Sequence, residues 1–241
     1  MPFVRQDMPQ YHYADSDGLI GLRGVMHYCQ IIHTWHFHTI DKGNDVLPQR
    51  YGAGWVYTRY HVVLNRKIDY SGPLTLRAWL EPYRQPVLIN ENVEILQGGS
   101  LAACAKLESC VFSLTRQRPV RLSAVEFPED FAEDIPNAIP DFLGTEKTAE
   151  GTAERYVRTV RTSDLDVNGH MNNLRYIEMF RDAHDSAFWQ AFPAREMEIC
   201  FLTQCREGEA ISVRSRTEAD RVHMAALHAD GRLAAVASFL R

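Results

Sequence analysis

Two long stretches of this 241-residue chain have apolar residues at steps of three and four. One lies between residues 19 and 41 and the other runs from Asn172 to about Phe192, and this spacing predicts two helices with a buried face. The first apolar stripe consists of Leu22, Val25, Met26, Cys29, Ile32 and Trp35. The second consists of Tyr176, Ile177, Met179, Phe180, Ala183, Ala187 and Phe188.

Strand-like runs precede and follow each predicted helix. "QYHYADSD" comes before the first helix, and "RYVRTVRTSD" comes shortly before the second. The first helix is followed by "GWVYTRYHVVL", "PLTLRAWLEP", "VLINENVEIL" and "SLAACAKLESCVFSL". The second is followed by "MEICFLTQC", "AISVRSRTE", "RVHMAALHA" and "RLAAVASFL". The same order of elements therefore occurs twice.

The last strand of each half gives the clearest internal repeat. "GGSLAACA" at residues 98–105 resembles "DGRLAAVA" at residues 230–237, each a glycine-containing turn that leads into an apolar strand. Together with the repeated element order, this predicts a duplicated unit of one long helix and four or five antiparallel strands. A sheet wrapped around one long helix buries that helix almost entirely. The predicted fold class is therefore α+β, a tandem of two hotdog-type units.

A segment of different composition separates the two halves. Residues 116–153 are rich in proline and acidic residues and lack a regular apolar period, which is typical of a connector. Its spaced Phe and Ile residues favour a connector that lies over the surface. We expect an N-terminal hotdog at residues 1–130, a linker at 131–152 and a C-terminal hotdog at 153–241.

Composition and charge exclude several classes of protein. A hydrophobic content of 45% is enough for a real core, and a formal charge of −5 with a pI near 6.1 argues against a general nucleic-acid binder. No apolar run approaches the length of a membrane span, and the N-terminus lacks the pattern of a secretory or transit peptide. The five cysteines are odd in number and form no CxxC pair. We therefore expect a cytoplasmic protein with reduced thiols.

The stretch "DLDVNGHMNN", which ends at Asn173, is unusually polar for the start of a helix with a wide apolar face. Asp166, Asn168 and His170 alternate with other residues, so an extended backbone would project them to one side. Asn172 and Asn173 lie where the helix begins and can cap its free N–H groups. The start of a buried helix can stabilise negative charge on a carbonyl oxygen, and a carboxylate or imidazole can take a proton from water.

Those groups are sufficient to hydrolyse an ester or a thioester. A polar turn with capping asparagines and a surface histidine accounts for the same spacing without any chemistry. Spacing alone leaves both interpretations open, because one turn rich in Asn and Asp is a weak signal.

The residue identities in the motif are more specific than their spacing. "DLDVNGHMNNLRYIEMF" resembles the signature of the acyl-acyl-carrier-protein (acyl-ACP) thioesterases, the bacterial and plant plastid enzymes that release fatty acids from their carrier protein. "GWVYTRYHVVLNRKIDYSGPLTLRAWLEP" and "GGSLAACAKLESCVFSL" look like segments of the same family's first half. The resemblance covers nearly the whole chain. It implies a hydrolase of fatty acid biosynthesis and lipid metabolism with the tandem hotdog fold, no cofactor, and acyl carrier protein as its partner.

Carried over from the family, the catalytic Asp, Asn and His fall on Asp166, Asn168 and His170. Another functional position of the family, usually Glu and often followed by Cys, falls on Gln204 and Cys205. A Gln cannot take up a proton at neutral pH and can only orient water. We therefore expect direct attack by water, with Gln204 facing the site from a strand and Cys205 on the opposite face. Asp166 accepts the proton through His170, and backbone N–H groups near Asn172 stabilise the oxyanion. Cys205 as a nucleophile is the less favoured alternative.

The resemblance also assigns roles outside the motif. The first half should house the acyl chain, with Met26, Ile32, Trp55 and Trp79 as lining or as plain core. In an acidic chain, the basic run that contains Arg116, Arg118 and Arg121 would dock an acidic carrier protein, or else form only a solvated connector.

Three histidines of the first helix, His33, His36 and His38, invite a metal interpretation. No carboxylate or Cys lies at an obvious ligand spacing, so polar packing is favoured and no metal is expected. Two other functions remain open: a thioesterase for acyl-CoA or another small thioester, and a non-catalytic acyl-binding relative that has lost the family Glu. A monomer and a homodimer are both open, because a tandem already supplies the contact that single hotdogs make by dimerising.

Overall fold

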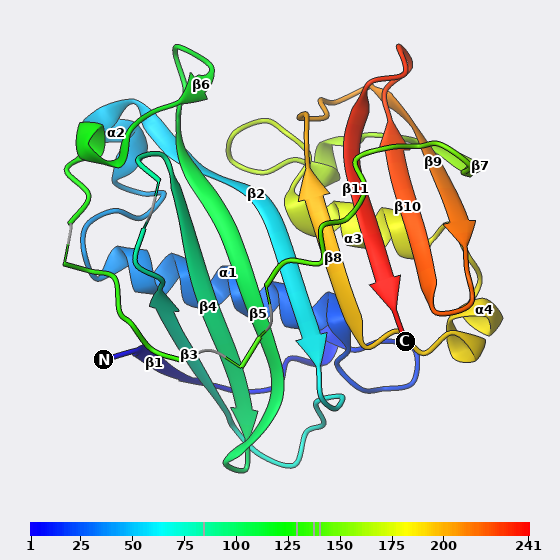
Figure 1. Ribbon diagram of the computed structural model, residues 1–241, viewed down its shortest axis with the longest axis horizontal. Helices are drawn as coiled ribbons and strands as arrows, with labels where there is room; N and C mark the ends of the chain where they lie inside the picture. The colour runs from blue at the N-terminus through cyan, green and yellow to red at the C-terminus, as the bar shows by residue number, and fades with distance from the viewer. Residues whose placement is uncertain (84, 129, 137, 140) are drawn as a thin grey trace. The chain divides into compact units, whose positions relative to one another are not determined.

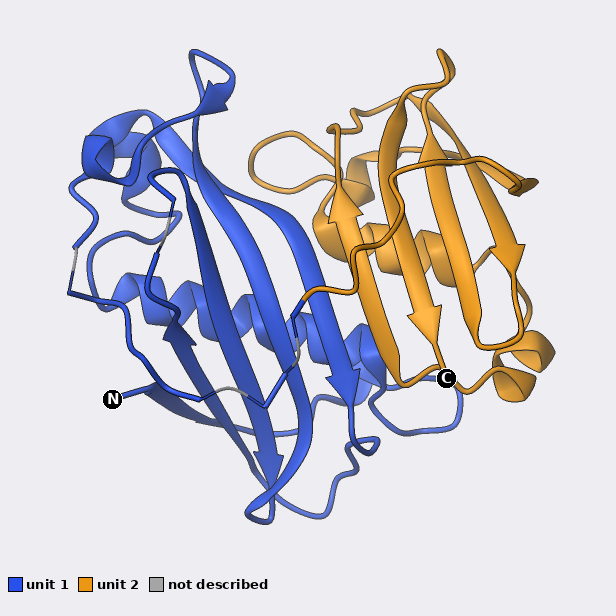
Figure 2. Cartoon of the chain, in the orientation of Figure 1, with its two compact units in different colours: residues 1–141 blue, residues 142–241 orange. Residues whose placement is uncertain are grey.

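The computed structural model describes residues 1–83, 85–128, 130–136, 138–139 and 141–241 (Figure 1). The chain forms two compact units, residues 1–141 and residues 142–241 (Figure 2). The predicted linker is thus divided between them. None of the helices in these residues is long and apolar enough to cross a membrane.

Unit 1 consists of an antiparallel sheet with one long helix against it (Figure 1). Its strands lie in the order β1-β3-β4-β5-β2, and the short β6 pairs with β5. The long helix is α1, Leu22–His38, and a short α2, Leu47–Tyr51, follows it. The strands are β1 Phe3–Asp7, β2 Ala53–Leu64, β3 Leu74–Leu80, β4 Leu88–Gln97, β5 Ser100–Ser113 and β6 Arg118–Pro119. Two 3-10 turns, Tyr11–Tyr13 and Leu122–Val125, complete the unit.

Unit 2 repeats this topology with a shorter helix. Its strands lie in the order β7-β9-β10-β11-β8, which matches unit 1 strand for strand. The helices are α3, Asn173–Arg181, and α4, Ser186–Ala191, and a 3-10 turn spans Thr162–Asp164. The strands are β7 Ala153–Thr159, β8 Glu196–Phe201, β9 Ala210–Thr217, β10 Arg221–Leu227 and β11 Leu233–Leu240. The predicted duplication and the α+β tandem fold are confirmed.

The repeated sequence occupies equivalent places in the two sheets. β5 lies between β4 and β2, and β11 lies between β10 and β8. Each of these strands follows a tight turn that contains a glycine in the left-handed region, Gly99 at φ 78° and Gly231 at φ 84°. Only glycine adopts this conformation without a steric cost, which explains why the two halves share it.

Both helices bury most of the predicted stripe, and the exceptions are Trp35 on α1 and, beyond the end of α3, Ala183, Ala187 and Phe188. On α1, five of the six apolar positions are buried, but Trp35 is 45% exposed and lies over the guanidinium of Arg5. On α3, Tyr176, Ile177, Met179 and Phe180 are buried. Ala187 is exposed and belongs to a different helix.

Two element boundaries differ from the sequence prediction. The second helix ends at Arg181, because Asp185 begins a new helix by accepting a hydrogen bond from the backbone N–H of Phe188 at 2.8 Å. The first strand is Phe3–Asp7, which pairs with β3, whereas "QYHYADSD" forms a 3-10 turn and a loop. The five cysteines are all buried and free, as predicted.

Candidate functional site

The polar motif forms a tight turn at the entry to α3. The backbone N–H of Asp166 donates to the carbonyl of His170 at 2.8 Å, and that of Gly169 donates to the carbonyl of Asp166 at 3.0 Å. Gly169 has φ 73°, which closes the turn at low cost. The expected extended backbone is therefore wrong. The turn nevertheless brings Asp166 and His170 to its two ends, side by side.

The carboxylate of Asp166 shapes this turn from inside. One of its oxygens accepts a hydrogen bond from the backbone N–H of Asn168 at 2.8 Å. Asn168 and Val167 are exposed at the tip, and Asp166 and His170 are partly buried. Partial burial lowers the pKa of His170, the positive charge of Arg206 lowers it further, and Asp166 acts in the opposite direction. The imidazole is therefore favoured in its neutral, proton-accepting form near pH 7.

The asparagine at the start of α3 caps the helix, as predicted. The side-chain oxygen of Asn172 accepts from the backbone N–H of Leu174 at 2.9 Å. Its own backbone N–H donates to the carbonyl of Asp164 at 2.8 Å. Asp164 is buried and binds the guanidinium of Arg158 at 2.5 Å and the backbone N–H of Arg161 at 2.9 Å. Asp164 is thus committed to the structure that supports the turn.

Gln204 and Cys205 lie in the loop after β8, because the strand ends at Phe201. The prediction that they share a strand is wrong. Gln204 is exposed and Cys205 is fully buried. The carbonyl of Cys205 accepts a hydrogen bond from the backbone N–H of Met171 at 2.9 Å, which ties this loop to the motif. Burial raises the pKa of the Cys205 thiol to about 11, so the thiolate that a nucleophile needs is disfavoured.

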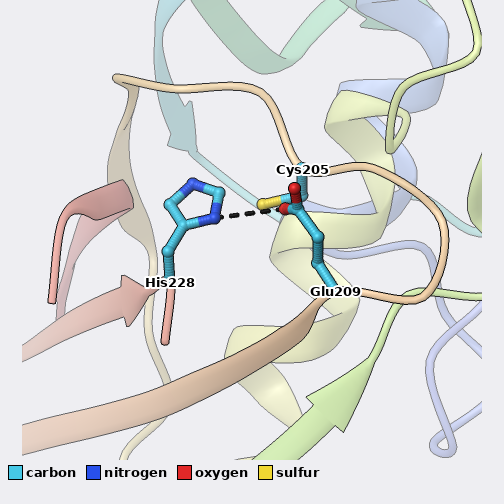
Figure 3. A group of neighbouring side chains, drawn as sticks. All are labelled: Cys205, Glu209 and His228. Atoms are coloured by element: carbon cyan, nitrogen blue, oxygen red, sulfur yellow. Dashed lines mark ion pairs between the residues drawn. The ribbon is translucent and has the colours of Figure 1, made fainter. Parts of the chain in front are cut away.

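A group of side chains beside the motif was not found by sequence reasoning. Cys205, Glu209 and His228 converge, with one ligand atom of each within 4.8 Å of the others (Figure 3). Nδ1 of His228 lies 3.1 Å from Oε2 of Glu209. His228 follows β10 directly and is far from Cys205 in sequence, so only the fold brings the two together.

Unit 1 contains the same turn with different side chains. The backbone N–H of Asp15 donates to the carbonyl of Leu19 at 2.8 Å, and that of Gly18 donates to the carbonyl of Asp15 at 3.0 Å. The next residue, Ile20, then donates to the carbonyl of Ile68 at 2.9 Å, just as Met171 donates to Cys205.

This correspondence aligns Asp15 with Asp166 and Leu19 with His170. Because Lys67 directly precedes Ile68, it occupies the place of Gln204. The ammonium of Lys67 pairs with Asp17 and lies 3.7 Å from Asp15. The sequence carries the same correspondence, with "DSDG" before the first helix and "DVNG" before the second.

The predicted acyl-pocket residues are all core residues of unit 1. Met26, Ile32, Trp55 and Trp79 are each at most 5% exposed, and the indole N–H of Trp55 donates to the carbonyl of Lys42 at 2.7 Å. A cavity of about 470 Å³ in this unit has a mainly polar and acidic lining, and none of the four lies in it. Their role in acyl binding stays a prediction.

The histidines of α1 meet a carboxylate that sequence spacing could not reveal. Glu91 on β4 is fully buried, and its two oxygens lie 2.6 Å from Nδ1 of His33 and 2.6 Å from Nδ1 of His36. Burial opposes ionisation of Glu91, but the two imidazoles prevail and lower its pKa to about 2. The prediction of polar packing is confirmed for these two residues, whereas His38 is exposed and lies 3.4 Å from Asp45.

The three arginines predicted to dock a carrier protein lie on or beside the β5–β6 hairpin. Arg116, Arg118 and Arg121 are all exposed. None of them forms an ion pair with any residue that the structure describes. Their charges are therefore available to a partner.

Comparison with known proteins gives the same assignment as the motif. Residues 145–234, most of unit 2, match the family model of the acyl-ACP thioesterase C-terminal domain. An acyl-ACP thioesterase from Bacteroides thetaiotaomicron is 18% identical, with a TM-score of 0.86 over 99% of this chain and 97% of its own.

The 12:0-ACP thioesterase from Umbellularia californica is 15% identical, with a TM-score of 0.86 over 99% of this chain and 96% of its own. No curated protein sequence matches. At these identities the structures establish the fold, and the family model establishes the relationship of unit 2. Residues 145–234 thus match the acyl-ACP thioesterase C-terminal domain, and the chain has the tandem hotdog fold along its whole length.

Proposed function

We propose that this protein hydrolyses the thioester of fatty acyl-acyl carrier protein and releases the free fatty acid. The observation that carries the proposal is the turn at the entry to α3. It joins the backbones of Asp166 and His170 by a hydrogen bond, and the pKa of the partly buried His170 imidazole is lowered. The family match over residues 145–234 covers this turn and supports the same activity.

In the proposed mechanism, water attacks the thioester carbonyl directly. His170 takes a proton from the water in its neutral form, and Asp166 stabilises the imidazolium that results. Asn168 holds the water or the carbonyl from the tip of the turn. Backbone N–H groups at the start of α3, near Asn172, stabilise the oxyanion. The thiolate of the carrier's prosthetic group leaves, and the proton held by His170 neutralises it.

Gln204 positions the attacking water in this mechanism. Its support comes from unit 1, where the residue in the equivalent place, Lys67, reaches both acidic side chains of the turn. A Gln side chain at the same position is long enough to approach Asp166 and its water. It donates and accepts hydrogen bonds without taking up the proton.

One observation favours a second function. The carboxylate that the family usually has at this position is replaced by Gln204, so a non-catalytic protein that binds acyl groups is the alternative. A third arrangement, hydrolysis of acyl-CoA or another small thioester, uses the same site with a different carrier.

The test measures free fatty acid release from acyl-carrier proteins loaded with C8 to C18 chains, in parallel with the matching acyl-CoAs. We expect turnover with a clear preference for the carrier-linked set. Equal or higher turnover of acyl-CoA would assign the protein to the small-thioester class. Binding of acyl ligand without turnover of either set would establish the binding protein.

We assign docking of the carrier to Arg116, Arg118 and Arg121. Their exposure, and their freedom from ion pairs among the described residues, supports this role in an otherwise acidic chain. Reversal of all three charges to Glu should raise KM for acyl-carrier substrate several-fold and leave hydrolysis of a small thioester unchanged. The same loss on both substrates would contradict docking at this hairpin.

A further inference from the structure

We infer that Cys205, Glu209 and His228 form a binding site for a divalent transition-metal ion of the zinc class. Cys205 and Glu209 lie in the loop of residues 202–209, and His228 follows β10. Figure 3 shows the sulfur of Cys205 and the imidazole of His228 directed toward the carboxylate of Glu209. The inference goes beyond hydrolysis and does not depend on it.

The donor set fits this class of metal. A thiol sulfur, an imidazole nitrogen and a carboxylate oxygen are the three ligand types of zinc sites, whereas Mg²⁺ and Ca²⁺ favour oxygen alone. All three ligand atoms lie within 4.8 Å of one another. Nδ1 of His228 and Oε2 of Glu209 are 3.1 Å apart, close to the roughly 3.3 Å between two ligands that share a tetrahedral zinc ion.

The hydrogen bonds around His228 identify which nitrogen faces the proposed metal. The hydroxyl of Thr203 has one proton, which it donates to the carbonyl of Leu233 at 2.8 Å. Its oxygen also lies 2.9 Å from Nε2 of His228, so in that contact Nε2–H is the donor. In a neutral imidazole, Nδ1 then presents a lone pair toward the carboxylate of Glu209.

The lone pair of His228 Nδ1 and the carboxylate oxygen of Glu209 repel each other at 3.1 Å. They therefore need either a cation between them or a proton on one of them. A second proton on His228 satisfies the Glu209 contact, and the thiol of Cys205 then keeps the side chain of Tyr176 as its hydrogen-bond partner. A metal ion uses all three groups: it takes the lone pair of Nδ1, the carboxylate, and the sulfur after the thiol proton leaves. Thr203 then orients the ring through the other nitrogen, as hydrogen-bond partners of metal-bound histidines do.

Such an ion would fix the position of the loop of residues 202–209. Gln204 lies between Thr203, which holds His228, and Cys205, which binds the metal. Cys205 is also bonded through its carbonyl to Met171 of the motif turn. Three protein ligands leave a fourth position for water, as in zinc sites that are not purely structural.

The experiment uses the full chain without a histidine tag, stripped by chelator and kept reduced. Titration with Co²⁺ should show one equivalent bound per chain, with the visible absorption of tetrahedral cobalt and a thiolate-to-cobalt charge-transfer band. Zn²⁺ should displace it. Cys205→Ser should abolish the charge-transfer band, and Glu209→Gln and His228→Gln should each weaken binding at least tenfold. Thr203→Val should weaken it about tenfold while all three ligands remain.

Matched controls come from the same unit. Cys200→Ser removes another buried thiol, and His223→Gln removes another buried imidazole, which bonds the carbonyl of Thr148 at 2.9 Å. Neither should alter the stoichiometry or the spectrum. The inference is overturned if Co²⁺ binds without a thiolate band, or if the controls lose binding as the ligand variants do. Retention of tight binding by Thr203→Val, Glu209→Gln and His228→Gln together would also overturn it. Circular dichroism of each variant reports folding independently of the metal.

Discussion

The two units form the same backbone turn before their long helices, but the side chains on the two turns differ in charge. In unit 1, Asp15 and Asp17 face the ammonium of Lys67, and Leu19 stands at the position of the histidine. In unit 2, Asp166 faces no such cation at the equivalent position, because Gln204 is neutral. The topology thus supplies two equivalent places for a site, and only the second has the side chains that we propose for catalysis.

The ion pairs of unit 1 show how such a turn is neutralised. Partial burial would raise the pKa of Asp17, but its contacts with Lys67 outweigh this and hold the pKa below its ordinary value. A carboxylate held in this way is a poor proton acceptor. In unit 2 the cation near the turn is Arg206, which acts on the pKa of His170, and Gln204 cannot give Asp166 the ion pair that Lys67 gives the turn of unit 1.

The interiors of the two units also handle buried carboxylates differently. In unit 1, Glu91 lies between two imidazoles at 2.6 Å. In unit 2, Glu198 is fully buried on β8 and accepts from the backbone N–H groups of Leu143 and Thr145 at 2.6 and 2.8 Å. One unit therefore neutralises its buried charge with side chains, and the other uses it to hold the incoming segment of chain.

The largest effect should come from Asp166→Asn, which removes the proposed proton partner while it keeps the shape of the turn. We expect kcat/KM to fall at least a hundredfold, as is typical when acid–base catalysis is lost. The matched control is Asp15→Asn at the equivalent position of unit 1, which should leave turnover near normal. Fatty acid release by both variants measures the difference. A near-normal rate for Asp166→Asn would remove this residue from the mechanism.

Glu91→Gln should strongly destabilise unit 1. The pKa of Glu91 falls from 4.5 to about 2 on folding, which corresponds to about 3 kcal/mol of stability. Because the folded pKa is the lower one, this stability is present above pH 4.5 and is lost as the pH falls toward 2. Urea unfolding at pH 7 and pH 3 should show a wild-type loss that the variant lacks.

The control for that change is Glu94→Gln on the same strand. Glu94 binds the guanidinium of Arg77 at 2.7 Å, and Arg77 is 35% exposed, so we expect a cost of about 1 kcal/mol or less. Equal losses of unfolding free energy in the two variants would mean that the imidazoles of His33 and His36 add nothing specific.

Repetition and periodicity were sufficient to predict most of this fold. The duplicated order of elements and the "LAAxA" strands gave the tandem architecture, because both depend on local sequence and on burial. The element boundaries that differ from the prediction depend on local features with weaker sequence signals. Asp185 ended the second helix early by capping a new one, and β1 was missed because five residues carry little period.

The sequence motif named the residues of the candidate site, but it did not predict their geometry. The motif named Asp166, Asn168 and His170, yet the turn through Gly169 replaced the expected extended backbone. The clusters around Glu91 and His228 could not be predicted, because each joins residues that are distant in sequence. Contacts of that kind depend on strand register, and a single sequence carries no direct signal for it.

Gln204→Lys should convert the second turn into a copy of the first. By analogy with Lys67, the new ammonium should pair with Asp166 and lower kcat/KM about tenfold, which corresponds to about 1.4 kcal/mol. Gln204→Glu should instead retain or raise the rate. Lys67→Gln, the exchange in the opposite direction, should leave hydrolysis unchanged. If Gln204→Lys had normal activity, the correspondence between positions 67 and 204 would not extend to chemistry.

The smallest effect concerns the charge of Arg206 near His170. Burial and Arg206 both lower the pKa of His170, so the neutral form extends to lower pH. Arg206→Gln removes the second cause, so the pKa of His170 should rise. Because the neutral imidazole accepts the proton, the acidic limb of kcat/KM should move to higher pH by the same amount. The rate on the plateau should not change. A limb that stays in place would mean that another group limits the rate, with Asp166 the first to examine, and the comparison between the two turns would then rest on the carboxylate alone.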